Sequence, residues 1–108
     1  MSEFIDRVAL VTGANRGIGL EVTRQLAIRG FTTILGARDV QKGDEAARSL
    51  QQGRLKVIPV QLDVTDQQSI DAVKHLVEER FGKLDVLVNN AAILYDSWQR
   101  AENANLNT

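Results

Sequence analysis

Apolar residues along this 108-residue chain form four short runs that are separated by amphipathic stretches. The runs lie at residues 8–11, 31–35, 55–62 and 85–88. They are rich in aliphatic and β-branched residues, which favour strands. Residues 8–11 (VALV) are apolar without alternation, as expected for a strand that is covered on both faces of a parallel sheet. The four runs are therefore predicted to be β-strands.

Three helices are predicted between these strands, each ended by a glycine. The first begins near Gly17, stops before Gly30 and packs on the sheet through a stripe at every fourth position, formed by Ile18, Val22 and Leu26. The second runs from Val40 to about Gln52, and Asp39 is placed to cap it. In the third, residues 65–68 (TDQQ) resemble a capping box with Thr65 as the N-cap and Asp66 as a first-turn acid.

The strict alternation of strand and helix predicts one α/β domain, a Rossmann-type parallel sheet with helices on both faces. Pro59 interrupts the third strand. Because proline donates no ladder hydrogen bond, that strand belongs at an edge or a bulge. The third strand is the edge in the order 3-2-1-4 of a dinucleotide-binding half. The sequence thus predicts an incomplete sheet of four strands in this order.

Composition excludes several functional classes. The chain has 44% hydrophobic and 25% charged residues, which is ordinary for a globular domain, and a net charge of −1, which argues against nucleic acid or an anionic membrane as a partner. It contains no cysteine, so no disulfide framework, thiolate nucleophile or zinc cluster is expected. No signal peptide or membrane-spanning run is recognisable, and we expect a cytoplasmic location and no metal site.

Residues 12–19 (TGANRGIG) join the first strand to the first helix and carry three glycines. Glycine lets the backbone approach a bulky anion, and the N–H groups of a helix's first turn attract phosphate. The spacing departs from G-x-G-x-x-G and lacks the Gly-Lys-Ser/Thr ending of a P-loop. We therefore interpret the loop as a cradle for the phosphates of a dinucleotide, with a plain structural turn as the alternative.

The loop after the second strand bears on the choice of dinucleotide. It places Arg38 next to Asp39, while Arg16 lies in the glycine loop. Two guanidinium groups suit a 2′-phosphate and would serve a bare ribose hydroxyl poorly, so NADP is favoured over NAD. Two alternatives remain open: both arginines are solvated surface residues, or Asp39 turns inward and favours NAD.

Polar residues also follow the third and fourth strands. Asp63 could accept from the adenine amino group while the backbone of Val64 contacts the ring; alternatively Asp63 is only a turn or cap residue. After the fourth strand, Asn89 and Asn90 could brace the neighbouring loop and bond the ribose, and the small Ala91 leaves room for the cofactor. All four loops are expected at the carboxyl ends of the strands, where ligands bind in such sheets.

Four motifs together resemble the classical short-chain dehydrogenase/reductase family, close to its carbonyl reductase branch. They are residues 12–19 (TGANRGIG), 37–39 (ARD), 62–65 (LDVT) and 84–92 (LDVLVNNAA), within a resemblance that covers residues 7–94. Ala92 stands where the family usually has glycine.

The resemblance implies a role for each loop. The glycine loop would hold the pyrophosphate, Arg16 and Arg38 the 2′-phosphate, Asp63 and Val64 the adenine, and Asn90 the ribose. The expected cofactor-binding residues are Thr12, Gly13, Asn15, Arg16, Gly17, Ile18, Gly19, Arg38, Asp63, Val64, Asn89, Asn90 and Ala91.

The resemblance further implies hydride transfer between NADP and a small carbonyl or alcohol substrate, with a tyrosine acid, a lysine four residues later, a serine and an asparagine. Here the only tyrosine is Tyr95, Gln99 lies four residues beyond it, and no lysine follows Lys83. No catalytic residue is therefore expected in this chain, and the segment alone is expected to be inactive.

We interpret residues 1–108 as the amino-terminal, NADP-binding part of a longer reductase. The bare hydrophobic edge of the fourth strand favours self-association. The alternative function is a non-catalytic nucleotide-binding sensor or scaffold.

Overall fold

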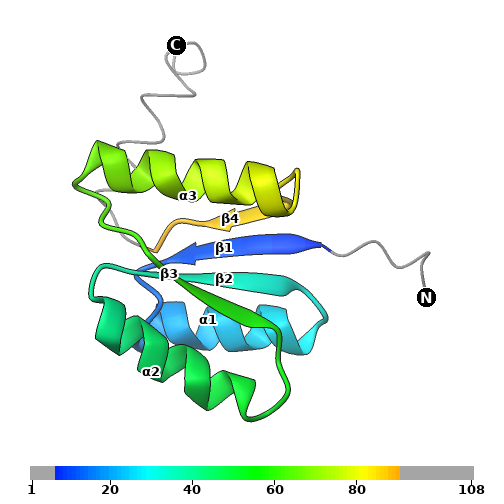
Figure 1. The fold of residues 1–108 in the computed structure, drawn as a ribbon. Coiled ribbons are helices and arrows are strands. Elements are labelled where there is room, and N and C mark those ends of the chain that lie inside the picture. The colour runs from blue at the N-terminus through cyan, green and yellow to red at the C-terminus, as the bar shows by residue number, and fades with distance from the viewer. Residues whose placement is uncertain (1–6, 91–108) are drawn as a thin grey trace, which may run out of the picture.

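A computed structural model of the chain describes residues 7–90. Its elements alternate without exception, as Figure 1 shows. In chain order they are β1 (Val8–Thr12), α1 (Gly17–Ile28), β2 (Thr32–Ala37), α2 (Val40–Gln51), β3 (Val57–Gln61), α3 (Gln67–Arg80) and β4 (Val86–Val88). The strands form one parallel sheet in the order β3-β2-β1-β4. The predicted fold class and strand order are confirmed.

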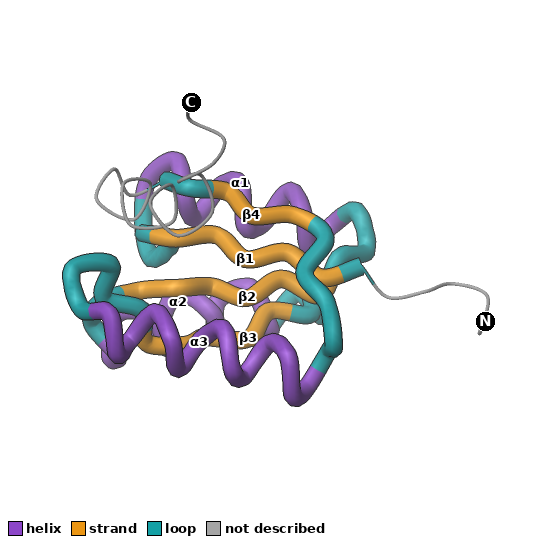
Figure 2. The backbone as a smooth tube through the Cα atoms, turned by 90° about the horizontal axis from the view of Figure 1, so that it is seen from above, coloured by secondary structure: helices purple, strands orange, loops and turns teal. Residues whose placement is uncertain are grey.

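Helices lie on both faces of this sheet. Figures 1 and 2 show α1 and α2 on one face and α3 on the other. Each face of the sheet has its own cluster of buried apolar side chains, because alternate residues of a strand point to opposite faces. Leu10 and Ile34 pack toward α3, whereas Val11 and Leu35 pack toward α1 and α2. The two central strands are buried along their whole length, as the apolar run of residues 8–11 predicts.

The strand register brings the carboxyl ends of all four strands to one edge of the sheet. Thr12 pairs with Gly36, Ala37 with Gln61, and Val11 with Val88. The loops that leave β1, β2, β3 and β4 therefore emerge side by side.

The buried face of α1 matches the predicted stripe in part: Val22 and Leu26 pack against the core, but Ile18 does not. The buried residues of α1 are Gly19, Thr23 and Ala27, while Ile18 is 76% exposed. Small residues on this face let the helix axis approach β1 closely, and the hydroxyl of Thr23 donates to the carbonyl of Gly19 at 2.8 Å. The prediction that Ile18 packs on the sheet was wrong because it weighed hydrophobicity alone and ignored this close approach.

The start of α3 also differs from the prediction. The N-cap is Asp66, whose carboxylate accepts from the Gln68 N–H at 3.1 Å. Thr65 is therefore not the cap, and Asp66 is not a first-turn acid. The Thr65 hydroxyl instead donates a hydrogen bond to the Asp63 carboxylate at 2.6 Å and does not cap the helix. The capping role of Asp39 is confirmed, because its carboxylate accepts from the Lys42 N–H at 3.1 Å.

Pro59 lies in β3, which is an edge strand, as predicted. The other edge is β4. Leu87 pairs in register with Leu10, so its side chain lies on the face of α3, yet it is 36% exposed. Figure 2 shows α3 over the β2 and β3 side of the sheet, away from β4. The open edge of β4 thus continues into a partly uncovered sheet face.

Candidate functional site

The four loops at the carboxyl edge of the sheet are tied together by hydrogen bonds. The Ala14 N–H donates to the Gly36 carbonyl at 3.0 Å, and the Leu62 N–H donates to the Ala37 carbonyl at 2.9 Å. The loop after β4 joins the glycine loop through Asn90. The predicted site residues that the structure describes therefore gather on one side of the molecule.

The glycine loop has the backbone geometry of an anion cradle. Gly13 and Gly17 have φ values of 60° and 62°, a conformation that side chains with a Cβ disfavour. Arg16 is the N-cap of α1 but makes no side-chain capping hydrogen bond, and the first turn contains no acidic residue. The first N–H groups of α1 are thus left for an external acceptor, and the helix dipole favours an anion there.

Gly19 is required for a different reason, which is space. A Cβ at this position would lie 2.4 Å from the carbonyl oxygen of Gly13 and 2.7 Å from the Asn90 Nδ2. No side chain fits between these atoms without displacing the loop. Gly19 therefore fixes how closely α1 approaches the loops that follow β1 and β4.

Asn90 braces the glycine loop, as predicted. Its Nδ2 donates to the Gly13 carbonyl at 3.0 Å, and its backbone N–H donates to the Thr12 hydroxyl at 2.9 Å. The buried Oδ1 of the adjacent Asn89 accepts no hydrogen bond within the part of the chain that the structure describes. A buried acceptor of this kind calls for a donor, so Asn89 is suited to meet a hydroxyl or N–H group that joins the site.

Basic side chains meet in a cavity of about 430 Å³ beside the ends of β1 and β2. We call it the basic cavity; its lining is Asn15, Arg16, Arg38, Asp39 and Lys42. Among residues 7–90, the salt bridges involve Arg24, His75 and Lys83, so none of the three cations of the cavity is engaged in one. This arrangement is suited to an anion with several oxygen acceptors.

Lys42 was not among the predicted site residues. It reaches the basic cavity because α2 begins at Val40, which places Lys42 in the first helical turn. The signal was present in the sequence: Lys42 follows Arg38 by four residues, about one helical turn, and the cap at Asp39 fixes where that turn starts.

Asp63 is held in one orientation by Thr65. One carboxylate oxygen, Oδ1, accepts both the N–H of Thr65 at 2.9 Å and its hydroxyl at 2.6 Å. These hydrogen bonds lower the pKa of Asp63, chiefly through the hydroxyl, and the positive charge of Arg38 lowers it further. The two site residues are thus electrostatic neighbours, and Asp63 stays ionised near neutral pH.

The remaining predicted residues are placed less tightly. Ile18 is exposed at the start of α1, and Val64 is half-buried against the core beneath α3. Ala91 and Tyr95 lie outside the described residues 7–90.

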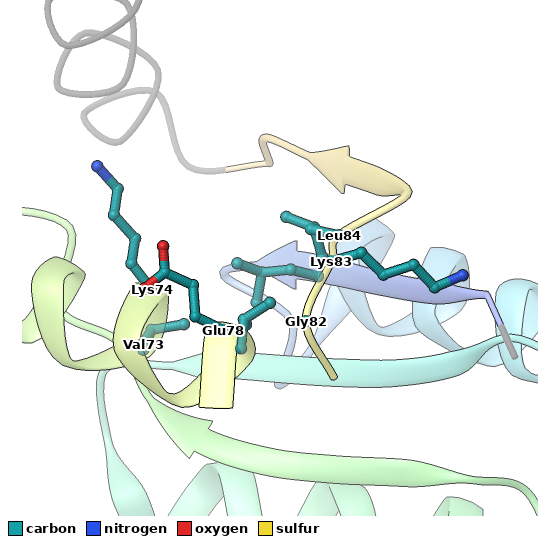
Figure 3. A pocket seen from close by; sticks show the side chains of 8 residues that line it. Val73, Lys74, Glu78, Gly82, Lys83 and Leu84 are labelled. Carbon is teal, nitrogen blue, oxygen red and sulfur yellow. The ribbon is translucent and has the colours of Figure 1, made fainter. Parts of the chain in front are cut away.

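A second cavity, of about 320 Å³, lies on the other side of the molecule between α3 and the segment that leads into β4. Figure 3 shows Val73, Lys74 and Glu78 of α3 on one side of it and Gly82 to Leu84 on the other. Leu10 and Val77 complete its lining, so its floor is apolar. It contains none of the predicted site residues. Residues 7–90 contain no group of three or more His, Cys, Asp or Glu side chains that could hold a metal ion, and none of their helices could span a membrane.

The family model described as short chain dehydrogenase matches residues 7–107. The chain belongs to the short-chain dehydrogenase family. The predicted resemblance is confirmed, including its carbonyl reductase branch: carbonyl reductase [NADPH] 3 of Homo sapiens is 50% identical over 93 residues, which are 84% of this chain and 33% of that protein.

Solved structures of short-chain dehydrogenases share the fold. Menthone neomenthol reductase from Mentha piperita superposes with a TM-score of 0.77 at 37% identity and covers 95% of this chain and 40% of its own. L-Sorbose reductase from Gluconobacter frateurii, complexed with NADPH and L-sorbose, superposes with a TM-score of 0.75 at 41% identity. It covers 80% of this chain and 33% of its own. This short-chain dehydrogenase chain spans about a third of the length of the curated relatives it matches.

Proposed function

We propose that this chain supplies the NADP-binding part of an oxidoreductase that transfers hydride between the nicotinamide and a carbonyl or alcohol substrate. The observation that carries the proposal is the basic cavity. It holds three cations that form no salt bridge within residues 7–90, next to a helix N-terminus without a side-chain cap on a Rossmann-type sheet. A dinucleotide with a 2′-phosphate matches this distribution of charge, because its pyrophosphate suits the helix end and its extra phosphate suits the cavity.

Each loop then has a defined role. The glycine loop, from Thr12 and Gly13 through Gly17 and Ile18 to Gly19, would receive the pyrophosphate on its N–H groups. Asn15, Arg16, Arg38 and Lys42 would bind the 2′-phosphate in the basic cavity.

The other two loops would hold the nucleosides. Asp63 would accept the adenine amino group while the backbone of Val64 contacts the ring. Asn89 and Asn90 would bond the ribose, and we extend the site to Ala91 on its position alone.

The residues that the structure describes fit bound NADP. The unpartnered Oδ1 of Asn89 gains a donor from a ribose hydroxyl, and the uncapped N–H groups of α1 gain acceptors from phosphate oxygens. When bound, NADPH supplies the hydride. This chain's residues bind and orient the dinucleotide, and Arg16, Arg38 and Lys42 compensate the negative charge that distinguishes it from NADH.

NADP is favoured over NAD because the basic cavity is lined by three cations, Arg16, Arg38 and Lys42, against the single acid Asp39. One of its oxygens accepts the Lys42 N–H as the cap of α2, so that oxygen is engaged with the helix. A carboxylate that caps a helix is less available to bind the ribose hydroxyl of NAD. The carbonyl reductase of Homo sapiens and the L-sorbose reductase structure, both named with NADPH, support the same choice.

We also propose that residues 1–108 belong to a longer reductase whose acid and lysine lie beyond this segment. The relatives are about three times as long as this chain, and no lysine follows Lys83 within it. The alternative, a non-catalytic nucleotide sensor or scaffold, would need the same binding site but no turnover. The expected cytoplasmic location stays a prediction, which cell fractionation would test.

Oxidation of NADPH in the presence of aldehydes and ketones separates the two functions. The whole protein should consume NADPH with at least one carbonyl of the panel, and residues 1–108 alone should not, because they lack a tyrosine–lysine pair at the required spacing. Tight NADPH binding without turnover by the whole protein would favour the sensor. Turnover by residues 1–108 alone would contradict the proposed assignment of the catalytic groups to another segment.

A further inference from the structure

The basic cavity contains one residue of the wrong charge for a phosphate. Asp39 lines it together with Arg16, Arg38 and Lys42. A carboxylate there repels the anion that the three cations attract, and no salt bridge between Asp39 and any of them is formed in the described structure. The presence of this acid needs an explanation.

Capping explains an oxygen at this position but not a charge. Asp39 accepts the Lys42 N–H as the N-cap of α2. Asparagine and serine cap helices about as well as aspartate does, so the cap alone would be satisfied by a neutral side chain. The charge interacts favourably with the helix dipole, but a phosphate in the basic cavity competes for the same positive helix end.

We propose that Asp39 is a specificity-determining residue that limits the preference of this site for NADPH over NADH. This inference rests on the proposed function of the basic cavity. Through its capping oxygen Asp39 fixes the first turn of α2 and hence Lys42. Through its charge it opposes the 2′-phosphate and leaves the site more tolerant of a dinucleotide without one.

The two roles separate in the variants Asp39→Asn and Asp39→Ser. Both keep an oxygen for the Lys42 N–H and remove the negative charge. In the whole protein, each should raise the ratio of NADPH to NADH affinity, measured by titration calorimetry, by about three- to tenfold, the scale for one like charge near an aqueous site. The rise should shrink in high salt because screening weakens the repulsion.

Asp44→Asn is the matched control. Asp44 lies on the same helix, is exposed, and does not line the basic cavity, so its removal changes the net charge equally. Its affinity ratio should stay within about twofold of the wild type. An equal rise in Asp44→Asn would overturn the proposal, because the effect would then come from overall charge.

The outcomes distinguish this proposal from the proposed function. Wild-type protein that binds NADPH no more tightly than NADH contradicts the function itself. If the wild type prefers NADPH and neither Asp39→Asn nor Asp39→Ser raises that preference, only the proposed role of Asp39 is contradicted. Unfolding transitions equal to the wild type would show that α2 is intact in both variants; if Asp39→Asn unfolds early, Asp39→Ser decides.

Discussion

For single residues, the small space between the loops defines this site as much as charge does. Gly19 lies where the loops after β1 and β4 converge, and its missing side chain leaves room for the Asn90 amide to reach the Gly13 carbonyl. The glycine is therefore needed for close packing, whereas Gly13 and Gly17 are needed for their positive φ.

Replacement of Gly19 by alanine should damage both the fold and the site. The new Cβ would overlap the Gly13 carbonyl, so we expect a loss of about 1–3 kcal/mol in the free energy of unfolding, typical of overpacking, and weaker NADPH binding. Denaturant unfolding and calorimetry measure the two effects.

Gly53→Ala is the control for Gly19→Ala, because its Cβ would meet only the Leu50 carbonyl at 3.4 Å. It should change the unfolding free energy by less than about 0.5 kcal/mol. Gly19→Ala with wild-type stability and affinity would show that the loop accommodates a side chain there, against our interpretation.

The site residues could be found from the sequence only where a motif fixed their position. Arg16 was predicted because it lies in the glycine loop, Arg38 because it follows the second strand, and Asn90 because it follows the fourth. Lys42 was missed although the start of α2 was predicted, because only the loop before that helix was considered for the site. Ile18 was assigned to the core although it is exposed, because periodicity alone does not show how near a helix lies to its sheet.

At the scale of elements, Asp85 joins the edge strand β4 to the centre of the sheet. Its Oδ2 accepts the Val8 N–H at 2.7 Å and the Lys83 ammonium at 3.1 Å. These bonds, the Val8 N–H first, lower the pKa of Asp85 below its ordinary value of 3.8. The carboxylate thus holds the first residue of β1 beside the start of β4.

The lowered pKa of Asp85 makes this contact sensitive to acid. Below pH 3.8 Asp85 binds a proton in the unfolded chain but is still ionised in the folded chain. The stability that Asp85 contributes is therefore present above pH 3.8 and is lost as the pH falls through the pKa of the folded state. Asp85→Asn keeps an acceptor for the Val8 N–H but loses the ion pair. It should be less stable than the wild type near neutral pH, by an amount that shrinks as the pH drops below 3.8.

Chemical denaturation at several pH values gives this difference. Asp44→Asn, which removes one exposed negative charge from α2, is the control for net charge. A difference between wild type and Asp85→Asn that stays constant down to strongly acidic pH would contradict the assignment.

Element boundaries show which local signals the sequence carries. A cap with one suitable acid, such as Asp39, could be predicted, whereas residues 63–66 contain three oxygen-bearing side chains that compete for the cap, those of Asp63, Thr65 and Asp66. There Thr65 bonds to Asp63 and leaves the cap to Asp66, a choice that depends on the tertiary position of Asp63. Pro59 located the edge strand correctly because its missing N–H is a property of the residue itself.

At the scale of the whole molecule, the strand order followed from alternation and a single proline. Within residues 7–90 the sheet has no strand beyond β4, whose Leu87 is 36% exposed. An unpaired apolar edge is a template for pairing with another strand.

Residues 1–108 by themselves should therefore self-associate through β4. Leu87→Lys should shift the assembly toward monomer in analytical ultracentrifugation, because a charged side chain on an edge opposes pairing. Ile28→Lys, which adds the same charge at the exposed end of α1, should leave the assembly unchanged. Equal behaviour of the two variants would place the association elsewhere.

If the ends of β1 and β2 bind a dinucleotide through its 2′-phosphate, replacement of Arg38 by alanine should weaken the binding of NADPH far more than that of NADH. Calorimetric titration of the whole protein should show NADPH bound more weakly by about 1.5–3 kcal/mol, or about 10- to 150-fold, with NADH almost unaffected. An unchanged ratio of NADPH to NADH affinity would remove Arg38 from the site and contradict the account.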